Sequence, residues 1–150
     1  MKDEGIPRSS FWNSIRGHMH WHVVLTHFPI SFFTVSAGFM MLHMITLNEC
    51  YEIAAFLCLV AGMLMLIPTT LTGWSTWKSK YNGASTKIFR YKIIISYALI
   101  ILSLILIGAR GALMPTLHTL WHVIFSAGFV LLFVGAMTEG FYGGQLNHRK

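Results

Sequence analysis

The chain has 150 residues, of which 55% are apolar and only 11% are charged, and its formal net charge is +6. A typical soluble domain carries about 25% charged residues, and a chain of this length cannot bury so many apolar side chains in one core. The composition therefore excludes an ordinary soluble domain and indicates that apolar side chains face lipid. No nucleic-acid-binding motif accompanies the positive charge, so we expect attraction to anionic membrane lipid and no nucleic-acid partner.

Long apolar runs follow one another along the chain, at about 21–45, 51–74, 88–107 and 117–141. Each reaches the roughly 20 residues that an α-helix needs to cross a hydrocarbon core of about 30 Å. The runs are continuous rather than alternating, which favours helices over a β-barrel. We therefore predict an all-α fold, an integral membrane four-helix up-down bundle that forms a single transmembrane domain over residues 1–150. Residues 1–20 are expected to form a cytoplasmic or interfacial arm.

Basic residues are distributed unevenly between the two ends of such a bundle. The end that holds both termini and the loop after the second span would carry ten of the eleven lysines and arginines. Arg110 would lie at the opposite end, together with the acids Glu49 and Glu52. Because loops rich in lysine and arginine stay in the cytoplasm, we predict a multi-pass protein of the inner membrane with both termini cytoplasmic.

The first span is entered through a group of histidines, at His18, His20, His22 and His27. Histidine is the commonest metal ligand and the side chain that titrates nearest neutral pH, so this group is a candidate site. A further histidine, His43, lies near the periplasmic end of the same span. Pro29 leaves two alternatives: the helix begins near Phe28 with the proline in its first turn, or it begins near Trp21 and Pro29 kinks it.

The second and third spans carry fewer candidate groups. The connection at 47–50 is short, which predicts an antiparallel hairpin of the first two spans. Pro68 should bend the second span, and the threonines that follow it can satisfy carbonyl groups that lose their partners. The third span has no histidine and is expected to be structural. Cys50 and Cys58 stand in no metal-binding spacing.

The fourth span combines two histidines with an acid. His118 and His122 are four residues apart and would share one helix face. Glu139 is the only acid at or near membrane depth in the chain. It is either a carboxyl of a proton or quinone site or an acid that reaches the cytoplasmic interface, and the sequence slightly favours the interface.

The first and fourth spans would be neighbours in a ring of four helices, which brings three histidines to the periplasmic end. Paired imidazoles from facing helices are usual axial ligands of haem b. We predict His43 and His122 as the preferred pair, with His118 as the other candidate partner of His43. Membrane histidines also serve as interhelical hydrogen-bonding groups, and this interpretation stays open for each of them.

A second haem at the cytoplasmic end would use His27 or His22. The second, third and fourth spans have no histidine at that depth, so its other ligand would come from the arm, from a methionine or from another subunit. The sequence therefore leaves one or two haems open. The metal ligands that we predict are His43, His122 and His27.

The favoured function is a haem b-binding electron-transfer subunit that links a quinone pool to another redox subunit or a periplasmic cytochrome. Any substrate turnover would belong to that partner. Two other functions stay open. One is a non-redox membrane protein whose histidines bind a transition metal or tune a proton site. The other is a structural anchor subunit of a membrane complex.

Three short elements carry a resemblance: His22-x4-His27-Phe-Pro-Ile30, Gly73-Trp74-Ser-Thr-Trp77 and Gly140-Phe-Tyr-Gly-Gly144. They resemble the signature of a family of small bacterial membrane proteins of unknown function with four predicted spans. The resemblance covers most of the chain, and the His-Phe-Pro-Ile element is its most specific part. It implies the four-span fold and polar elements at the cytoplasmic end. His43, His118 and His122 lie outside the pattern, and Arg90-Tyr91-Lys92 stands where many members carry a histidine.

Overall fold

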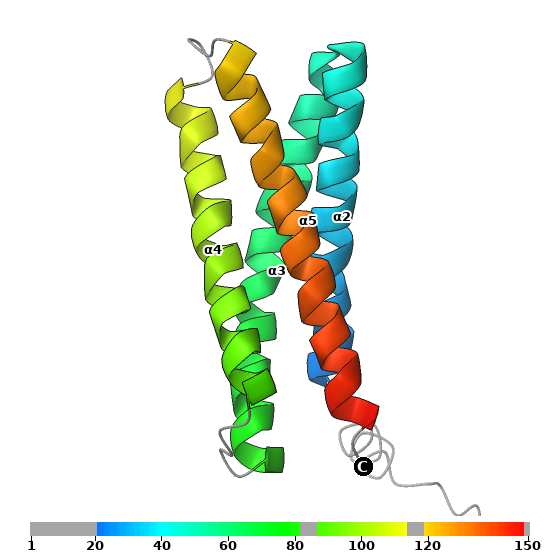
Figure 1. Cartoon of the computed structure of the whole chain (residues 1–150), viewed down its shortest axis with the longest axis vertical. Helices are drawn as coiled ribbons and strands as arrows, with labels where there is room; N and C mark the ends of the chain where they lie inside the picture. The colour runs from blue at the N-terminus through cyan, green and yellow to red at the C-terminus, as the bar shows by residue number, and fades with distance from the viewer. Residues whose placement is uncertain (1–20, 82–86, 114–118, 149–150) are drawn as a thin grey trace, which may run out of the picture.

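The chain folds into long α-helices, α2 (Trp21–Thr46), α3 (Glu49–Tyr81), α4 (Lys87–Leu113) and α5 (Thr119–His148), which Figure 1 shows. This computed structural model describes residues 21–81, 87–113 and 119–148. The residues in these three ranges form no β-strand. All four helices are long and apolar enough to cross a membrane. The predicted all-α four-helix bundle is therefore confirmed, and the chain has the helices of a multi-pass membrane protein.

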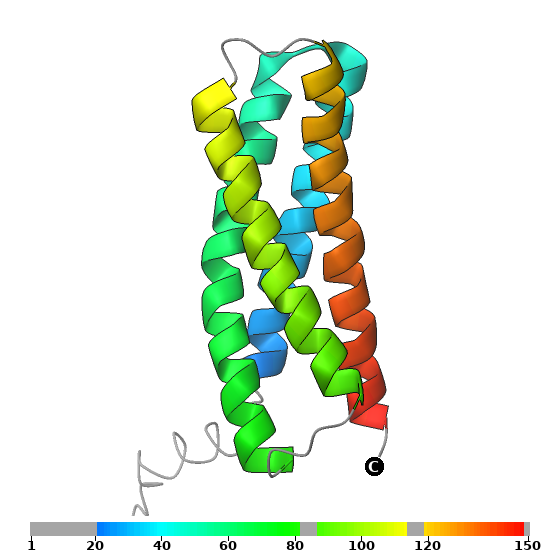
Figure 2. The same cartoon turned by 60° about the vertical axis from the view of Figure 1, so that its left-hand side comes forward.

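The helices run up and down in a ring in which each helix packs against two neighbours (Figures 1 and 2). α2 and α4 each contact α3 and α5, and the α2–α3 interface is the most extensive. We call the end at which α2 begins and α5 ends the base, and the opposite end the apex. The base lies at the bottom of Figure 1 and corresponds to the end that the sequence predicts to be cytoplasmic.

α2 is helical from Trp21 and continues through Pro29, so the helix does not start near Phe28. Proline has no backbone N–H, and the carbonyl group four residues earlier, that of Leu25, loses its donor inside the helix. The Thr69 hydroxyl of α3 donates to this carbonyl oxygen at 3.1 Å, and also contacts the Met65 carbonyl of its own helix at 2.7 Å. A threonine of the second span thus satisfies a carbonyl that is freed in the first.

The core is narrow because most side chains face outward. Phe33, Leu59, Phe129 and Leu132 are at most 1% exposed, whereas large apolar side chains on the outer faces of all four helices are exposed. A Cβ atom at Gly128 would lie 2.6 Å from Leu106 Cδ2, so this glycine lets α4 and α5 approach closely. The exposed apolar faces are those that lipid would cover.

Three helices extend several residues beyond the predicted spans. α3 continues to Tyr81, α4 to Leu113 and α5 to His148. In α3 the extension has a local reason, because the turn-forming pair Asn82-Gly83 comes only after Tyr81. The predicted arm 1–20 with its two histidines, and also His118, lie outside the described residues.

Candidate functional site at the base of the bundle

The base of the bundle holds a set of polar side chains to which all four helices contribute. His22 of α2 contacts Thr72 of α3, and Lys92 of α4 forms an ion pair with Glu139 of α5. Ser96 of α4 binds the same carboxylate. We call these five side chains the base cluster.

His22 is held by the helix that follows it in the chain. Its Nδ1 lies 3.3 Å from Thr72 Oγ1. The Thr72 hydroxyl donates to the Pro68 carbonyl oxygen at 2.8 Å, so its oxygen is available to accept the proton of Nδ1. Gly73 permits this approach, because a Cβ atom there would lie 2.9 Å from His22 Cε1. The imidazole therefore rests directly on the backbone of α3.

Glu139 is largely enclosed by the helices at the base. Its side chain is only 12% exposed. Oε1 accepts a hydrogen bond from the Ser96 hydroxyl at 2.6 Å, and Oε2 lies 3.7 Å from Lys92 Nζ. A carboxylate removed from water needs such partners, because an isolated charge in a low-dielectric interior is strongly unfavourable.

Lys92 connects the two halves of the cluster. Its side chain is 14% exposed and lies within electrostatic range of the His22 imidazole. The ammonium group also packs on the backbone of α5, where a Cβ atom at Gly143 would lie 3.4 Å from Nζ. The charge of Lys92 therefore acts on both Glu139 and His22.

The three sequence elements that carry the family resemblance meet at the base. His22 of the first element rests on Gly73 of the second. Ile30 of the first element packs on Gly140 of the third, where a Cβ atom would lie 3.2 Å from Ile30 Cδ1. Gly143 of the third element accommodates Lys92. Elements that are far apart in the sequence thus build one end of the molecule.

The two histidines predicted for a second haem point in different directions. His22 faces the neighbouring helix, as described above. His27 is exposed, and its Nδ1 lies 2.7 Å from the Val23 carbonyl oxygen of its own helix. Only His22 is therefore part of the base cluster.

His43 lies at the apex, in the last turn of α2. Its Nδ1 lies 3.0 Å from the Asn48 carbonyl oxygen, so it closes the turn between α2 and α3. A carbonyl oxygen only accepts, so Nδ1 carries the proton and Nε2 keeps a free lone pair.

His122 belongs to the first turn of α5, at the same end as His43. Met44, next to His43, and Val123, next to His122, line the same cavity between α2 and α5. The structure thus brings the preferred haem pair to the same end of the bundle.

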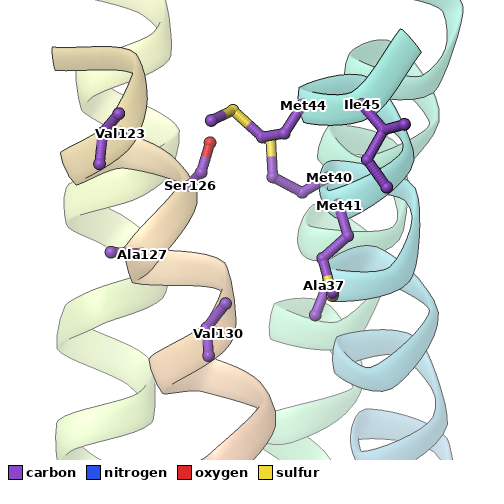
Figure 3. Close-up of a pocket in the computed structure, with 9 residues that line it drawn as sticks. All are labelled: Ala37, Met40, Met41, Met44, Ile45, Val123, Ser126, Ala127 and Val130. Atoms are coloured by element: carbon purple, nitrogen blue, oxygen red, sulfur yellow. The ribbon is translucent and has the colours of Figure 1, made fainter. Parts of the chain in front are cut away.

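An open apolar cavity of about 350 Å³ lies between α2 and α5 toward the apex (Figure 3). Figure 3 shows the Met44 side chain of α2 extending toward Ser126 of α5. The nine lining residues include no histidine, and they are Ala37, Met40, Met41, Met44, Ile45, Val123, Ser126, Ala127 and Val130. The cavity therefore adjoins the turns that carry His43 and His122 without being lined by either side chain.

The predicted metal ligands are not gathered into one group. Within the described ranges, no three His, Cys, Asp or Glu side chains lie close enough together to hold a metal ion. His27 belongs to the base, whereas His43 and His122 belong to the apex. An axial pair of histidines for haem needs only two ligands, so this observation leaves that prediction in place.

The apex contains a second ion pair that joins α3 to α4. Arg110 Nε lies 2.8 Å from Glu52 Oε1, and its Nη2 lies 3.0 Å from Glu52 Oε2. The guanidinium carbon also lies 4.1 Å above the centre of the Phe56 ring. The sequence analysis uses Arg110 and Glu52 only to predict the orientation of the bundle in the membrane, and it does not predict that they form an ion pair.

The contributions of α4 are the part of the site that the sequence misses. The third span is expected to be structural, yet it supplies Lys92 and Ser96. One signal was available: these two residues are four positions apart and share a helix face on an otherwise apolar span. Their partner could be found only from the register between α4 and α5, which aligns Ser96 with Glu139.

Comparison with known proteins provides no relative on which to base an assignment. No family model matches the chain, and no curated protein and no solved structure matches it. The resemblance to the small bacterial four-span family therefore stays a prediction.

Proposed function

We propose that this chain is a multi-pass protein of a bacterial inner membrane, with its base in the cytoplasm, and that its base cluster is a proton-exchange site. The observation that supports this function is the enclosed Glu139 carboxylate, bound to Ser96 and paired with Lys92. Ionisable groups in membrane spans are costly to insert and usually mark a functional site or a proton relay.

Two protonation states of the cluster differ in charge. With Glu139 ionised, its negative charge balances that of Lys92. A proton on Glu139 removes this balance and leaves the ammonium charge near His22. The charge state of Glu139 therefore bears on His22 through the ammonium group of Lys92.

The place of the cluster supports the same proposal. His22 lies at the beginning of α2, nearest the base, whereas Glu139 and Ser96 lie further into the bundle. A proton that enters from the base would meet the imidazole first. The glycines Gly73 and Gly143 keep backbone rather than side chain beside His22 and Lys92, which allows both polar groups to lie between the helices.

The test is infrared difference spectroscopy of the full-length protein in lipid bilayers during a pH change. We expect a carbonyl stretching band of a protonated carboxyl group that disappears in Glu139→Gln. Glu49→Gln is the matched control, because Glu49 is an exposed acid at the apex. A band that survives Glu139→Gln, or a proton uptake by reconstituted vesicles that this substitution leaves unchanged, would refute the proposal.

The second candidate is the haem b-binding electron-transfer subunit, which would connect a quinone pool to a redox partner subunit or a periplasmic cytochrome. The observation that favours it is the apolar cavity between α2 and α5, at the end where His43 keeps its Nε2 free. Haem is a large apolar ring that takes axial imidazole ligands, and His122 would be the second ligand.

An optical spectrum distinguishes this candidate from the first. Haem ligation predicts a Soret band after expression with added haem, and loss of the low-spin signal in His43→Ala or His122→Ala. His148→Ala, at the end of α5, should leave the spectrum unchanged. Absence of the band would exclude this candidate, and absence of both the band and a titrating carboxyl group would leave the structural anchor.

A further inference from the structure

The cavity between α2 and α5 has a buried floor and an exposed rim. Ala37 and Met40 of α2 line it and are buried, whereas most of the other lining residues, among them Met41, Ile45 and Val130, are exposed on the outer surface of the bundle (Figure 3). In a membrane, lipid covers this outer surface. The cavity is therefore continuous with the lipid-facing surface of the protein.

The shape of the cavity follows from the way in which α2 and α5 cross. Nearer the base, Ile30 packs on Gly140, whereas toward the apex α5 leans away from α2 and the cavity lies between them (Figure 1). Its lining extends from Ala37 to Ile45 on α2, which is about 12 Å at a rise of 1.5 Å per residue. This length fits within one leaflet of a hydrocarbon core about 30 Å thick. An occupant would therefore lie along the helices in the leaflet at the apex.

The described side chains that line the cavity offer no free hydrogen-bond donor. Ser126 is the only hydroxyl among them, and it donates to the His122 carbonyl oxygen at 2.8 Å. Met40, Met41 and Met44 form much of the wall on α2, and methionine side chains adapt readily to irregular apolar surfaces. A quinone headgroup would find no donor here, and water would find too few polar partners. A hydrocarbon chain needs neither.

We propose that this cavity holds one acyl chain of a membrane phospholipid, which completes the contact between α2 and α5 at the apex. Atoms that line an empty space lose van der Waals contacts, and a chain that enters from the surrounding lipid restores them. The headgroup of the same lipid stays at the membrane surface. The inference goes beyond the proposed function and does not depend on the base cluster.

The experiment is photolabelling of the full-length protein in bilayers of phosphatidylethanolamine, a fraction of which carries a diazirine in its acyl chain. Surface lipid is washed away with detergent before irradiation, and mass spectrometry of peptides locates the attached lipid. We expect the label on the lining residues of α2 and α5. Label spread evenly over the exposed faces of all four helices would indicate ordinary surface lipid and would overturn the proposal.

A substitution that fills the cavity should exclude the chain. Ala127 lines the cavity and is exposed, so the ring of Ala127→Phe can occupy the space without displacing a core side chain. We expect the label to fall about tenfold or more, because every CH₂ group that loses its place weakens binding. Ala98→Phe is the matched control, since it makes the same enlargement at an exposed position of α4 outside the cavity and should leave labelling unchanged. Equal labelling of wild type and Ala127→Phe would contradict the proposal.

Val130→Phe keeps the test decisive if Ala127→Phe does not fold, because it narrows the same cavity from the end nearer the base. Added haem is the last arm, since the second candidate function uses the same cavity. Haem that gives a Soret band and displaces the label would overturn the proposal in favour of that candidate, whereas a label that persists beside added haem supports it. No label at the cavity overturns the proposal, whether a second copy of the chain covers the space or nothing does.

Discussion

Two ion pairs join neighbouring helices at opposite ends of the bundle, and both involve α4. At the apex, Arg110 holds Glu52 through two short contacts of 2.8 and 3.0 Å and also covers the Phe56 ring. At the base, Lys92 lies 3.7 Å from Glu139, and no described residue accepts a hydrogen bond from it. Each end therefore pairs a basic side chain with a carboxylate, but two hydrogen bonds hold the pair at the apex, whereas the pair at the base is held by one longer contact.

This difference separates a structural pair from a candidate site. A bidentate guanidinium–carboxylate pair has a defined geometry and holds two helices together. α4 needs such support, because only 17% of its most apolar stretch is buried, compared with 33% in α5. The base pair has a longer contact without a defined hydrogen-bond geometry, so it supports α4 less firmly.

The largest effect is expected at the apex. Glu52→Leu leaves Arg110 without its partner, and we expect it to lower the free energy of unfolding by about 3 kcal/mol. The measurement is thermal denaturation in detergent, followed by circular dichroism. In the double variant Glu52→Leu/Arg110→Leu most of this loss should be recovered, since no unpaired charge remains. A single variant as stable as wild type would contradict the structural role of this pair.

A smaller effect is expected where α3 supports the proline-containing part of α2. Thr69→Val removes the hydroxyl that donates to the Leu25 carbonyl oxygen and should destabilise the protein by about 1 kcal/mol. In a Pro29→Ala background the same substitution should cost less, because the alanine N–H can bond to this carbonyl group. Equal costs in both backgrounds, measured by the same denaturation, would show that Thr69 does not compensate for the proline.

The base ion pair should contribute less to stability than the apex pair. We expect Lys92→Gln to change the free energy of unfolding by about 1 kcal/mol or less, because the long contact yields little and the removed charge was costly to enclose. Denaturation of Lys92→Gln beside Arg110→Gln provides the direct comparison. If both variants lose the same stability, the distinction between the two ends is wrong.

The smallest effect on stability is expected for Gly73→Ala. The new Cβ atom would lie 2.9 Å from His22 Cε1, at the outer end of a side chain that can turn away. We expect a stability change of about 0.5 kcal/mol or less, since alanine favours the helix, together with a clear change in the imidazole NMR signals of His22. Gly38→Ala is the control, because its Cβ atom would meet nothing within 4 Å. Unchanged His22 signals would contradict the contact.

The fold could be predicted from the sequence because the relevant information is local. Length and apolarity of each run decide that it is a helix of membrane length, and the short 47–50 connection decides that α2 and α3 are neighbours. The continuation of α2 through Pro29 could not be predicted, since it depends on Thr69 of another helix. The base cluster depends on the register between α4 and α5, which no single span contains.

The histidines show the same limit of prediction from sequence. His22 and His27 belong to one sequence element, yet one faces α3 and the other is exposed. Their difference in direction follows from one helix running through both, because five residues at about 100° each leave the two side chains about 140° apart. His43 and His122 lie at the same end of the bundle, and the cavity that their helices enclose there could be found only from the structure.

The hydrogen bond between Thr69 and Leu25 has a consequence for how the protein enters the membrane. An unsatisfied carbonyl group in hydrocarbon costs several kcal/mol, so α2 alone would enter the bilayer with a defect at Leu25. α3 removes that defect, and the short connection between Thr46 and Glu49 places it at hand as soon as it is synthesised. We therefore expect the first two helices to insert together, as one hairpin.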